Sequence, residues 1–273
     1  MRVSVFYDHI REASRQKEKP EEEILRELYQ AGVRGLEIRL WDFLEDQDLY
    51  EKILREGFLI SCIYEFYQME KLDETEKMKE HIDTAARTGC GRILAVPGFL
   101  DRNVAEEFQR LADTGDKKAL YSYMNEEQGI QSMCQGLARL SDYGKKKEVK
   151  VTVEDFDDYT SPLSRTYGIS WFLEQVPDLG FTFDMGNFAY MQEDIWEAWE
   201  KLSPYITHVH CKDRCRGLGP APAGTGDIPM KALAEKLKEI GYEGWLAAEH
   251  FGAPDQEAFM LGSAGFLIKT IRE

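Results

Sequence analysis

The run KVTVED (150–155) is followed along the chain by three further apolar runs: GFTFDMGN (180–187), ITHVHCKD (206–213) and GWLAAEHFG (244–252). Each run has the length of a buried strand and precedes a loop and a helix-like segment. Each also carries one residue of a type that binds metals: Glu154, Asp184, His210 and Glu249. A barrel of parallel strands brings such side chains together at its carboxyl end. These runs therefore predict a ring of four ligands at the mouth of a βα barrel.

The first half of the chain repeats the same alternation of strand and helix. Its apolar runs lie at 3–7, 35–39, 59–64 and 92–96. Helical patterns follow the eight runs at 20–31, 46–55, 74–88, 126–147, 163–175, 193–202, 229–240 and 255–271. Strict alternation implies parallel strands joined by right-handed crossovers. We predict an α/β fold of the (β/α)8 TIM barrel type, and an open doubly wound sheet is the competing architecture.

The bulk properties fit one enzyme-sized domain. The chain has 273 residues, close to the ~250 residues of an eight-fold βα barrel. No linker or shift in composition divides it, so we predict a single domain over 1–273. Only segment 99–125 is irregular, since it is about twice the usual length of a βα loop. It is interpreted either as a lid over the barrel mouth or as a surface elaboration.

Charge and cysteine content indicate which binding partners and which cellular compartment are expected. With 34 basic and 50 acidic residues, the formal charge of −16 disfavours nucleic acid and anionic membranes. No apolar run approaches the ~20 residues of a membrane span, and the amino terminus reads as a strand rather than a signal peptide. The cysteines are scattered and only 5 in number, which indicates a reducing compartment. The cytoplasm is the predicted location.

Alternation along the strands also predicts what lies beneath the ring. Residues two positions earlier point the same way, and they are Thr152, Thr182, His208 and Ala247. A polar layer is expected where metal ligands need hydrogen-bonding support, although His208 is also an alternative ligand to His210. Three carboxylates converging without a cation would repel one another. An oxygen-rich set with one imidazole suits one divalent ion, namely Mn, Mg, Co or Zn.

These residues resemble the xylose-isomerase-like barrel superfamily. The stretch HVHCKD (208–213) is similar to its His-x-Lys-Asp signature, and AGTGDIP (223–229) is similar to its Gly-x-Gly-Asp turn. Within it, the chain most resembles ketose 3-epimerases, hydroxypyruvate isomerases and inosose dehydratases. The resemblance spans the whole chain and is specific in the second half.

The resemblance implies a metal-dependent sugar isomerase or epimerase of carbohydrate metabolism. Its metal, manganese in preference to zinc, cobalt or magnesium, would be held by Glu154, Asp184, His210 and Glu249. Glu154 and Glu249 would be the catalytic acid/base pair, acting through a metal-stabilised enediolate on a ketose or hydroxy-keto acid. The alternatives are a dehydratase of keto-inositols or keto-sugars, and a non-catalytic metal- or sugar-binding homologue.

A small sugar is the expected partner, and assembly into a homo-oligomer is left open. The expected substrate-binding residues are Arg216, Asn187, Lys212, Glu37, Tyr64 and His9. Arg216 matches a family arginine that contacts substrate oxygen, and Lys212 is alternatively a structural partner of Asp213. Asn187 departs from the family, because many members carry histidine there and asparagine cannot carry a proton. The aromatic residues near the ends of the early strands would supply walls for a sugar.

A related barrel enzyme, the endonuclease of abasic DNA, fits poorly. Its three-metal cluster needs further histidines where this chain has Tyr64-Glu65, Pro97-Gly98 and Ile228-Pro229.

Overall fold

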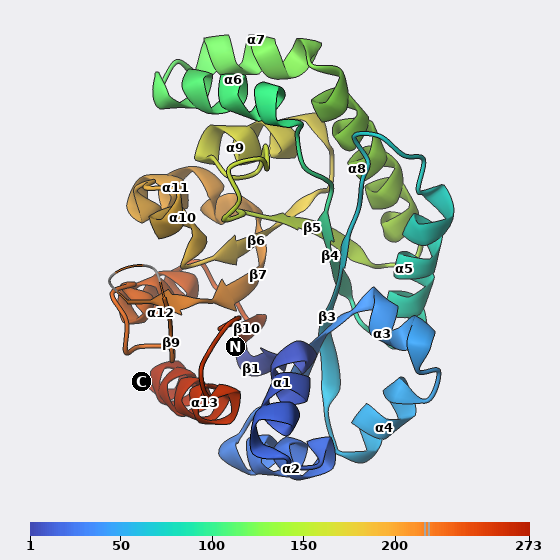
Figure 1. The fold of residues 1–273 in the computed structure, drawn as a ribbon, viewed down its shortest axis with the longest axis vertical. Coiled ribbons are helices and arrows are strands. Elements are labelled where there is room, and N and C mark those ends of the chain that lie inside the picture. The colour runs from blue at the N-terminus through green and yellow to red at the C-terminus, as the bar shows by residue number, and fades with distance from the viewer. Residues whose placement is uncertain (216, 218) are drawn as a thin grey trace.

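The computed structural model describes all residues of 1–273 except 216 and 218. Eight parallel strands form a closed barrel in the order β1-β10-β7-β6-β5-β4-β3-β2 (Figure 1). Their bounds are β1 Arg2–Phe6, β2 Gly35–Arg39, β3 Leu59–Phe66, β4 Arg92–Val96, β5 Lys150–Glu154, β6 Gly180–Asp184, β7 Ile206–Cys211 and β10 Trp245–Ala248. Strand β1 closes the barrel on β10, with Arg2 opposite Trp245 and Val5 opposite Ala248. The TIM barrel prediction is confirmed, and the open sheet is excluded.

The predicted helices are present around the barrel. They are α2 Glu21–Ala31, α4 Leu49–Arg55, α5 Thr75–Arg87, α8 Gln128–Lys146, α9 Thr166–Gln175, α11 Ile195–Leu202, α12 Met230–Glu239 and α13 Gln256–Arg272. Shorter elements between them were not predicted: α3 Leu40–Glu45, α10 Asn187–Tyr190, the 3-10 turn Ser203–Tyr205, and the antiparallel pair β8 Asp213–Arg214 and β9 Pro220–Ala221.

Helix α1 (Tyr7–Lys17) was also missed, because it follows β1 without a loop. Phe6 is both the last residue of the strand and the N-cap of the helix. Only a narrow face of this polar helix is buried, with Ile10 and Ala13 at helical spacing. That spacing is a weak signal, and the preceding strand pattern masks it.

Segment 99–125 is helical and does not close the barrel mouth. It forms α6 (Arg102–Asp113) and most of α7 (Lys117–Glu126), which lie beyond α8 and α9 at the outer edge of the molecule (Figure 1). Gln109 of α6 donates hydrogen bonds to the Tyr159 carbonyl (2.7 Å) and to Ser164 Oγ (2.8 Å). None of the described residues lining the mouth belongs to this segment. It therefore supports the loop after β5, and the choice between a lid and a surface elaboration stays a prediction.

Alternation along the strands separates two apolar clusters. The larger cluster lies between the strands and the helices and includes Val5, Ile38, Val153 and Cys211. The smaller cluster consists of Phe6, Cys62, Tyr64, Leu94 and Ala247. These residues occupy the opposite side of their strands, which faces the barrel interior. Cys211 belongs to the larger cluster on the helix side, so its thiol points away from the predicted ligands.

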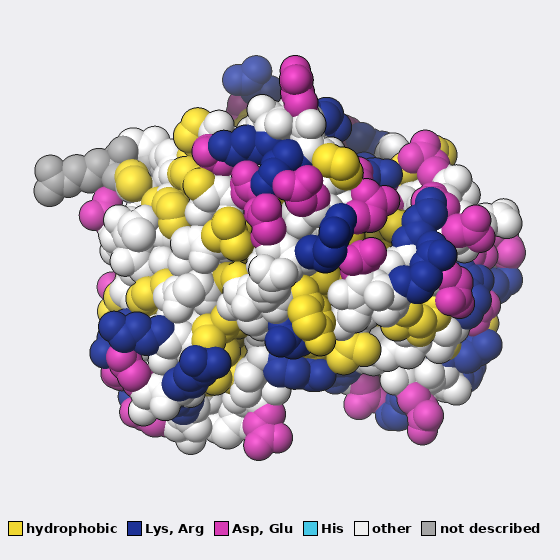
Figure 2. All heavy atoms as spheres, turned by 90° about the horizontal axis from the view of Figure 1, so that it is seen from below, with side chains coloured by type: hydrophobic (Ala, Val, Ile, Leu, Met, Phe, Trp, Pro, Cys, Tyr) yellow, Lys and Arg dark blue, Asp and Glu magenta, His cyan; other side chains and the backbone are white. Residues whose placement is uncertain are grey.

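The excess of acidic residues does not form a single-sign patch on the face drawn in Figure 2. Acidic and basic side chains alternate there. Ion pairs such as Lys19–Glu27 (2.9 Å) and Lys17–Asp255 (2.5 Å) join neighbouring elements of the barrel exterior. In the part of the chain that the structure describes, no helix combines the length and apolarity of a membrane span.

Helix α5 is joined to β3 by His81, which is buried in its neutral form. We therefore predict that the free energy of unfolding depends on pH. The Tyr67 hydroxyl lies 2.9 Å from His81 Nδ1, and His81 Nε2 lies 3.1 Å from the Ile63 carbonyl. In the neutral imidazole, Nε2 donates to the Ile63 carbonyl and Nδ1 accepts from the Tyr67 hydroxyl. Burial lowers the pKa of His81 to about 3, so the unfolded chain binds a proton at higher pH than the folded protein does.

The contribution of His81 to stability should be complete above pH ~6.5 and should fall as the pH drops toward ~3. Relative to His81→Gln, the wild type should lose about 2 kcal/mol of unfolding free energy between pH ~7 and ~5. Urea unfolding of both proteins at the two pH values measures this difference. An equal loss in both proteins would show that His81 does not titrate on unfolding.

Candidate metal centre

The four predicted ligands converge at the carboxyl ends of their strands. Glu154 and Asp184 end β5 and β6, His210 lies in β7, and Glu249 directly follows β10. All four are buried, and one candidate ligand atom from each lies within 4.8 Å of the others. The parallel register brings them together, since β6 places Asp184 opposite His210 on β7. The predicted ring is therefore present as a geometric cluster.

His210 lies at the centre of this cluster. Its Nδ1 is 2.6 Å from Glu154 Oε1, 3.0 Å from Glu249 Oε2 and 4.0 Å from Asp184 Oδ2. The carboxylates of Glu154 and Glu249 thus both approach the same imidazole nitrogen. Glu154 ends β5, which pairs with β6, and Glu249 follows β10, which pairs with β7.

Asp184 is held in place by the turn that follows β6. Its Oδ1 accepts hydrogen bonds from the backbone N–H groups of Gly186 (2.7 Å) and Asn187 (2.9 Å). A Cβ at position 186 would lie 2.4 Å from the Lys212 carbonyl oxygen, so the turn requires glycine. Asp184 Oδ2 is buried and has no hydrogen-bond partner among the described residues. One oxygen is therefore fixed by the backbone, and the other accepts no hydrogen bond but lies 3.5 Å from the ammonium of Lys212.

Burial makes the charge of this cluster costly. It raises the pKa of Glu154 and raises that of Asp184 well above the ordinary range. Burial also opposes the charged form of His210, but Glu37 and Glu154 outweigh it and raise the pKa of the imidazole. For Glu249, burial is outweighed by Lys212 and His210, which lower its pKa. The cluster thus needs positive charge, which protons and Lys212 supply here and a divalent cation would supply better.

Lys212 and Asn187 form a polar link beside the ring. Lys212 Nζ lies 2.6 Å from Glu249 Oε1 and 2.8 Å from Asn187 Oδ1. Asn187 Nδ2 donates to the Asp155 carbonyl at 2.7 Å. Both polar ends of the Asn187 amide thus bind protein groups, and the ammonium of Lys212 is the cation beside this position. Pairing with Asp213, the alternative considered for Lys212, is not what the structure shows.

A cavity of about 440 Å³ opens above the cluster. It is lined by Glu154, His210 and Glu249 but not by Asp184, which lies beneath. Of the predicted substrate-binding residues, Asn187, Lys212 and Tyr64 line it. Glu37 and His9 are not among its described lining residues, and Arg216 lies outside the described residues. The structure thus brings Asn187, Lys212 and Tyr64 to the cavity beside the ring, whereas Glu37 contacts His210 of the ring from a fully buried position and His9 is buried against His250.

His9 is positioned by His250 behind the ring. Its Nε2 accepts a hydrogen bond from the His250 backbone N–H at 3.0 Å, and the two rings stack at 4.6 Å. The ring of His9 is fully buried, and its contact with substrate stays a prediction. His250 itself contributes to the cavity wall.

The apolar walls of the cavity were only partly predicted. Phe6, Phe66, Phe156 and Phe251 line it together with Tyr64, whereas Trp41 is exposed and Tyr67 is buried elsewhere. Phe66 lies two residues after Tyr64 on β3, so strand alternation could have identified it. Phe156 and Phe251 lie in loops after β5 and β10, and no periodic signal marks them.

Asp213 ties together the two stretches that carry the family resemblance. Its carboxylate accepts backbone hydrogen bonds from Gly224 (2.8 Å), Gly226 (2.8 Å) and Ile228 (3.2 Å). A Cβ on Gly226 would lie 2.3 Å from Asp213 Oδ1, so the close approach requires glycine. The carboxylate therefore fixes the loop after β7, from which Arg214 and Pro220 line the cavity. Sequence reasoning did not assign this role to Asp213.

The protein is thus a closed (β/α)8 barrel whose candidate metal centre, made of three carboxylates and one imidazole, lies at the carboxyl ends of the strands. The model of the family described as "Xylose isomerase-like TIM barrel" matches residues 25–269, and the chain belongs to this family.

Solved structures share the fold over almost the whole chain. An L-ribulose 3-epimerase superposes with a TM-score of 0.72 at 15% identity, covering 99% of this chain and 94% of that one. IolI protein with a bound zinc atom gives 0.71 at 19%, covering 99% and 98%. The probable 3-DHS dehydratase AsbF of Bacillus anthracis gives 0.73 at 14%, covering 98% and 99%. At identities of 14% to 19%, these likenesses show the shared fold.

Among curated proteins, uncharacterized protein MJ1311 of Methanocaldococcus jannaschii is 33% identical over 118 residues, which are 40% of this chain. The match spans 38% of that relative's length.

Proposed function

We propose that the protein is a divalent-metal-dependent sugar isomerase or epimerase that acts on a ketose or a hydroxy-keto acid through an enediolate. The observation that carries this proposal is the convergence of Glu154, Asp184, His210 and Glu249 within 4.8 Å beneath a cavity. The buried Asp184 Oδ2 supports it, because this oxygen accepts no hydrogen bond from the described residues and has positive groups only at 3.5 Å (Lys212 Nζ) and 4.0 Å (His210 Nδ1).

The donor set fits a hard or borderline divalent cation. Three carboxylates and one imidazole, with no thiol among them, suit manganese, zinc, cobalt or magnesium, and we propose manganese. Zinc in IolI protein and magnesium in a xylose isomerase-like barrel protein of Mycobacterium smegmatis support a divalent ion. When bound, such an ion would polarise the carbonyl and hydroxyl oxygens of the substrate and stabilise the enediolate.

Glu154 and Glu249 are the proposed proton carriers. Both line the cavity, and both approach His210 Nδ1, so they flank one point from two strands. One carboxylate can remove the proton from the carbon between the carbonyl and the hydroxyl, and the other can return it on the opposite face. Asp184, which does not line the cavity, is proposed as a ligand only.

An unphosphorylated sugar fits the cavity best. Its volume of about 440 Å³ and its aromatic wall suit a small sugar with one apolar face. Its basic side chains already have acidic partners: Arg39 lies 3.2 Å from Glu65, and Arg214 lies 2.5 Å from Asp157. These pairs do not form a phosphate cradle. Lys212 and Tyr64 are proposed to bind sugar hydroxyls.

A dehydratase of a keto-sugar is the second candidate. The side chain at position 187 cannot carry a proton in the reaction, because an amide does not titrate. The two polar ends of the Asn187 amide instead bind Lys212 and Asp155. The ammonium of Lys212 beside the ring could instead donate a proton to a departing hydroxyl group. The dehydratase among the structural neighbours supports this alternative.

Solvent deuterium distinguishes these reactions. The manganese-loaded protein should incorporate deuterium at the carbon next to the carbonyl of an unphosphorylated ketopentose or ketohexose, and should form the isomer or epimer. Mass spectrometry and NMR of a sugar panel incubated in deuterium oxide measure both. A product that has lost water would identify the dehydratase. Manganese binding without exchange or product across the panel would support the non-catalytic homologue and overturn the enzyme proposal.

A further inference from the structure

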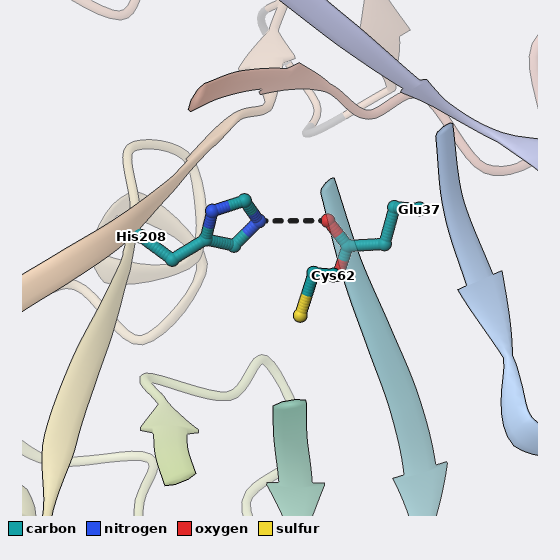
Figure 3. A group of neighbouring side chains, drawn as sticks. All are labelled: Glu37, Cys62 and His208. Carbon is teal, nitrogen blue, oxygen red and sulfur yellow. Dashed lines mark hydrogen bonds and ion pairs between the residues drawn. The ribbon is translucent and has the colours of Figure 1, made fainter. Parts of the chain in front are cut away.

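Glu37 on β2 joins two histidines across the barrel interior. Its Oε2 lies 2.8 Å from His208 Nε2, and its Oε1 lies 3.1 Å from His210 Nε2. Figure 3 shows the His208 ring directed at the Glu37 carboxylate, with Cys62 beside it. Glu37 and both histidines are at most 1% exposed. The carboxylate therefore uses both oxygens within the protein and has none left for solvent.

The position of Glu37 excludes direct contact with a substrate in the cavity. Glu37 is not among the described lining residues, whereas His210 is. The two nitrogens of His210 are divided between two environments: Nδ1 faces Glu154 and Glu249, and Nε2 faces Glu37. His210 is the member of the ring to which Glu37 is hydrogen-bonded.

We infer that Glu37 is the positioning residue of the metal centre: it accepts the Nε2–H of His210 and so directs the Nδ1 lone pair toward the ion. A carboxylate in this place fixes the tautomer and orientation of an imidazole ligand and increases its basicity. His208 donates to the second oxygen and keeps the carboxylate from turning. The inference rests on the proposed metal centre and changes the expected role of Glu37 from substrate binding to ligand orientation.

The trio Glu37, Cys62 and His208 also has atoms close enough to hold an ion of its own. Glu37 Oε2 is already bound to His208, and its other oxygen to His210. The inference therefore predicts one ion per chain, whereas a second site here would give two. Metal analysis of the wild type separates these arrangements.

Two variants test the role of Glu37. Glu37→Gln keeps the shape but offers only one acceptor oxygen for two imidazoles, and Glu37→Leu offers none. We expect manganese affinity to fall about 10-fold in the first and up to about 100-fold in the second, as with other partners of ligating histidines. Thr152→Val is the matched control, because Thr152 is buried in the same layer and binds Thr182 Oγ1 at 2.7 Å rather than a ligand. Titration with manganese measures the affinities.

Cobalt-loaded protein gives a readout that a purely structural role would not change. Wild type should show a paramagnetically shifted NMR signal from the His210 Nε2–H that exchanges with deuterium oxide. This signal should shift or broaden in Glu37→Gln and persist in Thr152→Val. The cobalt absorption spectrum should change in the same variants.

The outcomes separate the two proposals. Wild type that binds neither manganese nor cobalt would contradict the metal centre itself. Wild type that binds one ion, with an unchanged affinity and cobalt spectrum in folded Glu37 variants, would overturn the positioning role alone. If neither Glu37 variant folds, absence of the exchangeable Nε2–H signal from cobalt-loaded wild type would overturn it.

Discussion

Asp184→Asn is expected to lower the affinity for manganese more than about 100-fold, because even partners of ligands contribute about 10- to 100-fold. Asparagine can still accept the hydrogen bonds from Gly186 and Asn187, which leaves the turn intact. It replaces Oδ2, which accepts no hydrogen bond, by an amide NH2 group that cannot bind a cation. The metal-free variant should therefore be no less stable than the metal-free wild type, since a buried carboxylate is removed.

Thermal unfolding with and without manganese checks this prediction. At 100-fold excess over its dissociation constant, the ion should stabilise the wild type by about 3 kcal/mol and should not stabilise the variant. Asp42→Asn is the matched control, because Asp42 is buried and pairs with Arg11 away from the cavity. A variant that keeps the full manganese-induced shift would show that Asp184 is not a ligand.

Glu154→Gln and Glu249→Gln are each expected to lower turnover by about 100- to 10,000-fold at saturating metal, the range for loss of a general acid or base. If the carboxylates serve opposite faces of the sugar, each variant should retain proton exchange with one epimer only. Neither variant should interconvert the two epimers. Deuterium incorporation into each epimer, followed separately by NMR, measures this complementary pattern.

Metal affinity must be measured in the same variants, because both residues are also proposed ligands. Glu193→Gln is a suitable control, since Glu193 binds the Thr166 backbone N–H at 2.6 Å outside the cavity. Loss of exchange with both epimers in a fully metal-loaded single variant would contradict separate proton carriers. Unchanged epimerisation in either variant would remove that residue from the mechanism.

The ring of four candidate ligands could be predicted from the sequence because it follows from local patterns of apolar and polar residues. Buried parallel strands appear as short apolar runs, and strict alternation with helices limits the topology to very few arrangements. In such a fold, residues at the ends of successive strands must meet at the same end of the barrel. Glu154, Asp184, His210 and Glu249 are therefore identifiable by their position in each run, and the polar layer containing Thr152 follows from the two-residue period.

The roles of residues that depend on contacts across the barrel required the tertiary structure. Glu37 and His210 are separated by 173 positions, and nothing local to β2 indicates that its carboxylate meets the imidazole of β7. The same holds for Asn187, which lines the cavity but has both polar ends of its amide bound, one to Lys212 and the other to Asp155.

Loops and short helices were also beyond the sequence patterns. Phe156 and Phe251 form cavity walls from loop positions that have no period. Segment 99–125 lies on the outer wall because its helices find apolar partners there, with Phe108 fully buried. The sequence by itself thus determined the barrel and its ring of candidate ligands, since both follow from strand periodicity. Only the tertiary structure decided which groups orient those ligands and enclose the cavity, because closure and side-chain packing join residues that are distant in the chain.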